Sequence, residues 1–233
     1  MTQDERTMES RGIQFFGKVS ASLSHEIKNV FAVIGESSGL MEDLLAMHRN
    51  KGAPLDPDRL QTIAERIRKH LARGDAIVKN MNRFAHSADE PIQVKDLEEL
   101  TRLVVALAER HAMLRGVSLE VSSEDSPVPV ETNPFLLQQL LWTCIDFAVS
   151  VCGPSRKVTL RVGQAENGGR VILDSLEIPT SSTEEILPRE AGFLMRELGV
   201  GVSVCADGKE IGLFVPKRIS NQWENRQMAE IIE

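Results

Sequence analysis

The residues best placed to do chemistry lie in one short run, Leu23-Ser24-His25-Glu26-Ile27-Lys28-Asn29. His25 lies two residues from each of the apolar residues Leu23 and Ile27. Its ring should therefore lie at the rim of an apolar helical stripe and face solvent. A neutral imidazole nitrogen is a nucleophile near pH 7. Asn29 is three residues from Glu26 and four from His25, spacings that make neighbours on a helix surface. The run therefore predicts nucleophilic chemistry at His25, and the alternative is a solvated helix face with an incidental histidine.

The other histidines and the cysteines form no comparable pattern. No second histidine has a partner at metal-ligand spacing, and the three cysteines make neither a CxxC pair nor a Cys/His set. The odd number of cysteines favours free, buried thiols in a reducing compartment. The residues expected to be ordinary surface, boundary or core positions are His48, His70, His86, His111, Cys144, Cys152 and Cys205.

The composition excludes several classes of protein. The chain has 233 residues, a formal net charge of -7, 4% aromatic residues and no tyrosine. An acidic chain with few aromatic residues is poorly suited to bind nucleic acid. The polar N-terminus has no apolar signal core, and no run approaches the roughly 18 apolar residues of a membrane span. We therefore expect a cytoplasmic protein with no nucleic-acid partner and no membrane partner.

Two long amphipathic helices should position His25. Residues 13–49 hold no proline, and their apolar residues recur at helical spacing. Asp56-Pro57 is an N-cap followed by a first-turn proline, and a second helix should run from there to about residue 86. One hairpin cannot bury the stripes of both helices, whereas two hairpins in a four-helix bundle can, so the geometry predicts a homodimer. The two predicted stripes are Phe16, Val19, Leu23, Ile27, Val30, Ile34, Met41, Leu44 and Leu45, and Leu60, Ile63, Ile67, Leu71, Ile77 or Val78, Met81 and Phe84.

The rest of the chain alternates helices with short strands, an order typical of an α+β sandwich. The sequence therefore predicts a helical hairpin over 13–87, a sandwich domain over 92–219 and a tail over 220–233. The expected helices span 95–115, 134–151 and 183 or 184 to 198, and the expected strands span 117–122, 157–162, 170–173, 202–205 and 211–215.

The run around His25 resembles the phosphoacceptor box of sensor histidine kinases. Residues 75–85 are similar to the second hairpin helix of that family, and residues 91–151 follow its usual course into the ATP-binding domain. The resemblance implies a dimerisation and phosphoacceptor hairpin followed by a GHKL-type α/β sandwich. It also implies that His25 accepts a phosphoryl group, that Glu26 acts as acid or base, and that Asn29 positions water or the receiver domain.

The nucleotide-binding elements of that family are damaged in this chain. Two asparagines are usual in the helix that holds magnesium in that family. Their positions are occupied here by Thr143 and Phe147, and a phenyl ring cannot bind a hard cation. The aspartate of the adenine site matches Asp174, but the alternating glycines after it are replaced by Ser-Leu-Glu-Ile, and the glycine-rich lid is missing. We therefore expect a degenerate ATPase-like domain that binds no cofactor and no metal, with Asp174 as a remnant. Val30 also stands where the family often has proline.

The resemblance and the departures together predict a dimeric histidine phosphotransferase of a two-component phosphorelay. His25 would carry a phosphoryl group between receiver-domain aspartates without ATP, and the partner receiver would supply the magnesium at its own site. The expected partners are response-regulator receiver domains, an upstream kinase or phosphodonor protein, and a second copy of the chain. One alternative is a divergent sensor histidine kinase or a response-regulator phosphatase. A second alternative is a non-catalytic scaffold that docks a response regulator.

Overall fold

The computed structural model describes residues 3–123, 126–178, 187 and 189–219. Contacts divide the chain into two compact units, and the division follows Arg83. The expected helix start at 183 or 184 and the expected tail over 220–233 lie outside the described residues. In the described part of the chain, no helix is both long and apolar enough to cross a membrane.

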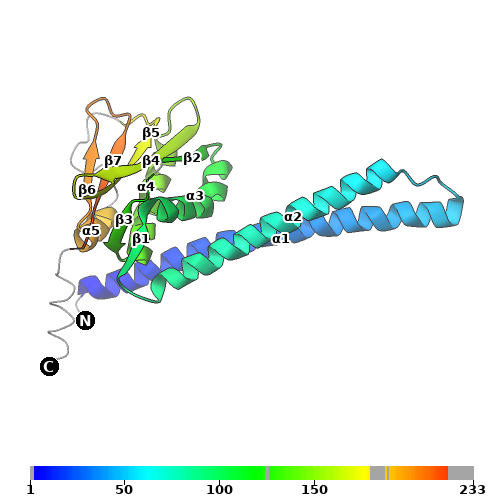
Figure 1. The fold of residues 1–233 in the computed structure, drawn as a ribbon, viewed down its shortest axis with the longest axis horizontal. Helices are drawn as coiled ribbons and strands as arrows, with labels where there is room; N and C mark the ends of the chain where they lie inside the picture. The colour runs from blue at the N-terminus through cyan, green and yellow to red at the C-terminus, as the bar shows by residue number, and fades with distance from the viewer. Residues whose placement is uncertain (1–2, 124–125, 179–186, 188, 220–233) are drawn as a thin grey trace, which may run out of the picture. The chain divides into compact units, whose positions relative to one another are not determined.

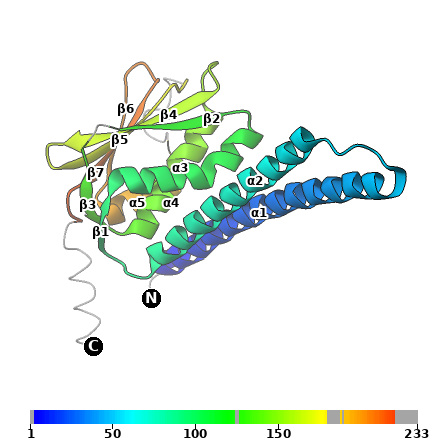
Figure 2. The same ribbon diagram turned by 45° about the vertical axis from the view of Figure 1, so that its right-hand side comes forward.

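The first unit consists of two long helices that lie side by side and antiparallel (Figures 1 and 2). Helix α1 spans Gln3–Lys51 and helix α2 spans Pro57–Ala85. Helix α1 begins well before the expected start at residue 13, because the polar segment ahead of that point holds no proline and several good helix formers. Asp56 caps α2, as predicted, since its carboxylate accepts a hydrogen bond from the backbone N–H of Asp58 at 3.0 Å.

The second unit is a mixed α+β structure, as predicted. Its strands form a two-stranded sheet, β1–β3, and a five-stranded sheet in the order β2-β4-β5-β7-β6. Strands β2 and β4 are parallel, and the other neighbours in the larger sheet are antiparallel. The elements are η1 (His86–Ala88), β1 (Gln93–Asp96), α3 (Leu97–Leu114), β2 (Ser118–Ser123), β3 (Pro129–Thr132), α4 (Pro134–Ser150), β4 (Lys157–Ala165), β5 (Gly168–Asp174), α5 (Arg189–Leu198), β6 (Gly201–Val204) and β7 (Ile211–Pro216).

One face of the five-stranded sheet is covered by α3, α4 and α5 (Figure 2). Alternate residues of the central strands point toward these helices, because side chains alternate between the faces of a sheet. The strand register aligns the buried side chains in rows, so the domain has one continuous core between sheet and helices. The two rows are Leu160, Leu173 and Ile211, and Val162, Val171 and Leu213.

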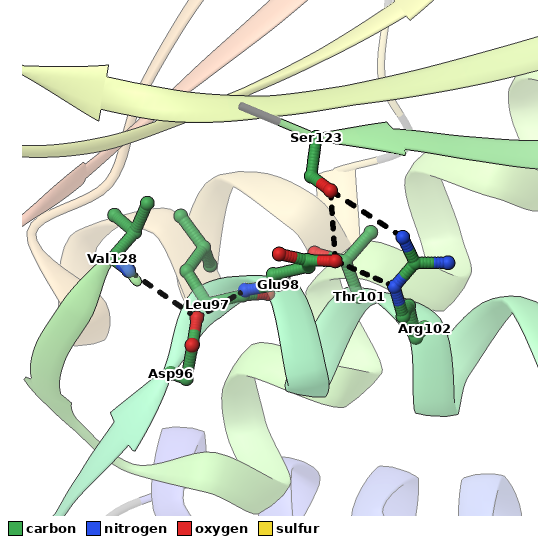
Figure 3. Close-up of polar contacts among 7 residues, drawn as sticks. All are labelled: Asp96, Leu97, Glu98, Thr101, Arg102, Ser123 and Val128. Atoms are coloured by element: carbon green, nitrogen blue, oxygen red, sulfur yellow. Dashed lines mark hydrogen bonds and ion pairs between the residues drawn. The ribbon is translucent and has the colours of Figure 1, made fainter. Parts of the chain in front are cut away.

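Strand β1 has no counterpart in the sequence prediction, which placed the start of a helix at residue 95. It pairs antiparallel with β3, and Val94 lies opposite Glu131. Asp96 ends the strand and caps α3, because its Oδ1 accepts hydrogen bonds from the backbone N–H groups of Glu98 at 2.9 Å and Val128 at 3.4 Å (Figure 3). A four-residue strand made only by a distant partner leaves little local signal.

The start of α3 is also fastened to the end of β2 by side chains (Figure 3). The Glu98 carboxylate accepts hydrogen bonds from Arg102 Nε at 2.7 Å and from Ser123 Oγ at 2.8 Å. These two hydrogen bonds, led by the one from Arg102, lower the pKa of Glu98. The contacts hold the first helix of the domain to an edge strand of its sheet.

Candidate functional site

The two helices of the first unit meet along a seam of residues that alternate at spacings of three and four. This repeat keeps one side of each helix facing the other. The ion pairs across the seam, Arg73 with Glu26 and Arg66 with Glu36, give its antiparallel register. The seam residues are Val19, Leu23, Glu26, Val30, Val33 and Ser37 on α1, and Ile63, Ile67, His70, Gly74 and Ile77 on α2.

His25 lies next to this seam but faces outward. Its side chain is exposed, whereas Leu23 and Glu26 on either side of it are buried. Among the described residues, His25 has no hydrogen bond or ion pair. An exposed imidazole with no partner is accessible to an incoming electrophile, which is the arrangement that a nucleophilic histidine requires.

Glu26 occupies a seam position that the predicted stripe gave to Ile27. The Glu26 side chain is only 10% exposed, and its Oε2 atom lies 3.4 Å from Nη2 of Arg73 on α2. A search for apolar residues misses this position because glutamate is polar. The seam positions are spaced alternately three and four residues apart, and this spacing places residue 26 between Leu23 and Val30. Arg73 is therefore the site neighbour that the sequence reading missed.

Asn29 is exposed and shares the outward face of α1 with His25, four residues earlier. Glu26 faces the seam instead, and the described part of the chain contains no hydrogen bond between Glu26 and Asn29. The structure thus brings together His25 and Asn29 on one face and leaves Glu26 on the next.

Asp174, the predicted remnant of an adenine site, lies at the end of β5 and forms an ion pair. Its Oδ2 atom is 3.3 Å from Arg161 Nε on the neighbouring strand, and its Oδ1 accepts a hydrogen bond from Ser175 Oγ at 2.8 Å. Arg161 also forms an ion pair with Glu210. A carboxylate held in this way is less available to accept a hydrogen bond from a ligand.

The segment after Asp174 is held by backbone hydrogen bonds on two sides. On one side, Glu177 N donates to Val151 O at 2.8 Å and Gly153 N donates to Ser175 O at 3.0 Å. On the other side, the segment donates to residues 208 and 209 at 2.9 Å and 3.1 Å. Residues 175–178 therefore form part of the folded framework of the domain.

Two apolar side chains of this segment point into the core. Leu176 is 2% exposed and Ile178 is 8% exposed. These are the two positions that correspond to the alternating glycines of the resembled family. A glycine would leave backbone open to a ligand there, whereas the buried leucine and isoleucine fill that space with side chain.

The oxygen groups of α4 at or next to the two positions matched to asparagines, Thr143 and Phe147, are also engaged. Thr143 Oγ1 donates to the backbone carbonyl of Gln139 at 2.9 Å. Asp146 accepts from His111 and from Arg115, both on or next to α3. Within the described residues, no group of three or more His, Cys, Asp or Glu side chains could hold a metal ion.

The three cysteines are free and differ in exposure. Cys144 is buried, and burial raises the pKa of its thiol to about 12. Cys205 is exposed, contrary to the expectation of buried thiols, because it lies beside the turn between β6 and β7. Partial desolvation and the neighbouring Glu210 raise the pKa of Cys205.

No protein-family model matches the sequence, and no curated protein matches it. Among solved structures, the nucleotide-free catalytic domain of the histidine kinase ThkA is 16% identical, with a TM-score of 0.47 over 56% of this chain and 100% of that chain. ThkA in complex with the response regulator protein TrrA is 21% identical, with a TM-score of 0.45 over 92% of this chain and 65% of that chain. A bacterial phosphotransferase is 14% identical, with a TM-score of 0.44 over 86% of this chain and 95% of that chain. With identities and scores this low, the likenesses do not place the chain in a family.

Proposed function

We propose that this chain is a dimeric histidine phosphotransferase of a two-component phosphorelay in which His25 carries the phosphoryl group. The observation behind the proposal is the contrast between the exposed His25 imidazole and the filled segment 174–178 of the second unit. A phosphoryl carrier needs an accessible nucleophile, whereas an ATP-dependent kinase also needs a metal site and a phosphate cradle. The contrast favours transfer between proteins over autophosphorylation with ATP.

The reaction is a displacement at phosphorus. The imidazole nitrogen with the free lone pair attacks the phosphorus of an aspartyl phosphate on a receiver domain. The phosphorus–nitrogen bond forms, the bond from phosphorus to the aspartate oxygen breaks, and the aspartate leaves as a carboxylate. The attack leaves a positive charge on the ring, and Glu26 either stabilises that charge while the other ring nitrogen keeps its hydrogen or accepts the proton from that nitrogen. Transfer to the next receiver is the same step in reverse.

The receiver domain supplies the metal in this proposal. The receiver's own acidic residues would hold the magnesium, which would supply charge neutralisation for the phosphoryl oxygens. Asn29 lies on the His25 face of α1 and positions the receiver or a water molecule. No step requires a cofactor bound by this chain.

A second copy of the chain is part of the proposal, because the hairpin exposes a second row of apolar side chains. Phe31 is 66% exposed, Leu71 is 56% exposed and Val78 is 45% exposed. Pairing two hairpins into a four-helix bundle would bury these side chains. A Phe31→Lys, Leu71→Lys double variant is expected to sediment as a monomer where the wild type sediments as a dimer, and a monomeric wild type would refute this part of the proposal.

The direct test follows radioactive phosphate. The purified chain is mixed with each receiver domain of its own organism, phosphorylated beforehand, and label on the chain is measured against time. We expect label on the wild type and none on His25→Ala, which should fold normally because the side chain is exposed. Absence of label on the wild type with every receiver, or equal label on His25→Ala, would disprove the proposal. Label from ATP and magnesium alone would favour the sensor-kinase alternative.

The exposure of Asn29 gives one specific reason to consider a receiver phosphatase. A phosphatase would release inorganic phosphate from the receiver by water attack, so its rate would survive His25→Ala and fall in Asn29→Ala. The phosphotransferase shows the opposite order of sensitivity to the two substitutions. Binding of a receiver with neither label nor phosphate release would support the scaffold alternative.

A further inference from the structure

Glu26 and His25 are adjacent in sequence but lie on different faces of α1. The Glu26 side chain is 10% exposed and faces the seam, whereas His25 is exposed. Consecutive residues of an α-helix point about 100° apart, so the two side chains diverge. If the carboxylate is to act on the ring, a group outside α1 must hold it near the edge of the seam.

Arg73 of α2 is that group. Its Nη2 atom donates to Oε2 of Glu26 at 3.4 Å, and its side chain is 56% exposed. Among the described residues, this is the one hydrogen bond or ion pair that Glu26 makes. A carboxylate in a mostly buried position is unfavourable without a counter-charge, and the guanidinium supplies that charge and fixes the place of the carboxylate.

The helix backbone is arranged to allow this contact. Gly74 follows Arg73, and a Cβ atom on Gly74 would lie 3.2 Å from Val30 Cγ1 of α1. The missing side chain therefore lets α2 come close to α1 at Val30, about one helical turn from Glu26. A second arginine pair, Arg66 with Glu36, joins the same two helices at 3.8 Å with both side chains at least half exposed.

We propose that Arg73 is a positioning residue for the reaction at His25, which holds the Glu26 carboxylate at the edge of the seam. There the carboxylate stabilises the positive charge that forms on the imidazole when it takes the phosphoryl group. This inference rests on the proposed function. Arg73 contacts neither the phosphoryl group nor the receiver in this arrangement and acts through Glu26, so it sets the rate of transfer and leaves receiver binding unchanged.

The test is a double-mutant cycle on Arg73→Ala and Glu26→Gln in the full chain. The transfer rate is measured with the receiver domain, phosphorylated with radioactive phosphate, that labels wild-type His25 fastest. We expect Arg73→Ala to lower the maximal transfer rate about tenfold with an unchanged half-saturation concentration for the receiver. Arg73→Lys should restore most of the rate, because the ammonium supplies the same charge. The double variant should be no slower than Glu26→Gln alone, since Arg73 has no target once the carboxylate is gone.

The matched control is Arg66→Ala, which removes the exposed pair from the same helices and should leave the transfer rate unchanged. Far-UV circular dichroism and the melting temperature of each variant separate a folding defect from a positioning defect, and Arg73→Lys carries the test if Arg73→Ala unfolds. The inference is overturned if Arg73→Ala transfers as fast as the wild type or if Arg73→Ala changes only the half-saturation concentration. It is also overturned if the rate losses of the two single variants multiply in the double variant. In those cases the wild type is still labelled on His25, whereas an unlabelled wild type overturns the proposed function itself.

Discussion

Two segments of this chain contain the residue types expected of a phosphoryl-transfer protein, and they are built in different ways. Residues 25–29 present His25 and Asn29 to solvent on one helix face. Residues 174–178 turn Leu176 and Ile178 into the core, and Asp174 is paired with Arg161. A nucleophile on a helix needs only local spacing, whereas a nucleotide cradle needs open backbone from several segments. The comparison shows that the candidate nucleophile is open to solvent, whereas the segment after Asp174 is part of the folded core.

The largest predicted effect separates the structural role of one segment from the chemical role of the other. Leu176→Ala should lower the free energy of unfolding by roughly 2–5 kcal/mol, because it leaves a cavity where a side chain is 2% exposed. His25→Ala should change it by less than about 0.5 kcal/mol, since that side chain is exposed. Urea unfolding followed by circular dichroism measures both values. Equal destabilisation by the two variants would contradict the comparison.

A smaller effect is expected at the turn between β6 and β7, which contacts residues 175–178. Gly208 has φ +68°, and a Cβ atom there would lie 2.5 Å from the carbonyl oxygen of Ile178. Gly208→Ala should therefore cost about 1–3 kcal/mol in urea unfolding, because the alanine is strained and displaces residue 178. The control is Gly192→Ala in α5, where space is open and alanine should be neutral or stabilising. If Gly208→Ala were as stable as the control, the segment would not depend on that contact.

The smallest effect concerns the pH dependence of the domain that carries the filled segment. The pKa of Glu98 lies below its usual value of 4.5, mainly because Arg102 and Ser123 hydrogen bond to the carboxylate. The stabilisation is therefore present above pH 4.5 and is lost as the pH falls through the lowered folded-state pKa. Glu98→Gln should reduce the free energy of unfolding at neutral pH by less than about 1 kcal/mol and remove this acid dependence. Urea unfolding at a series of pH values measures it, and an unchanged acid dependence in Glu98→Gln would refute the assignment.

Local signals predicted most of the elements in both units. The caps at Asp56 and Asn133, each followed by proline, mark the starts of α2 and α4 where the structure has them. Alternating apolar residues predicted β4, β5 and β7, because every second side chain of these strands is buried on one face of the sheet. Strand β1 escaped prediction because its pairing with β3 depends on a partner over 30 residues away.

The sequence by itself determined the helical spacing that places His25 and Asn29 on one face, because the period of a helix is set by the backbone. It also determined that residues 175–178 contain no glycine. Only the tertiary structure decided that Glu26 faces the seam and pairs with Arg73, since this depends on which side of α1 meets α2. Likewise, only the folded domain shows that Leu176 is buried, because burial depends on contacts with segments that are distant in the chain.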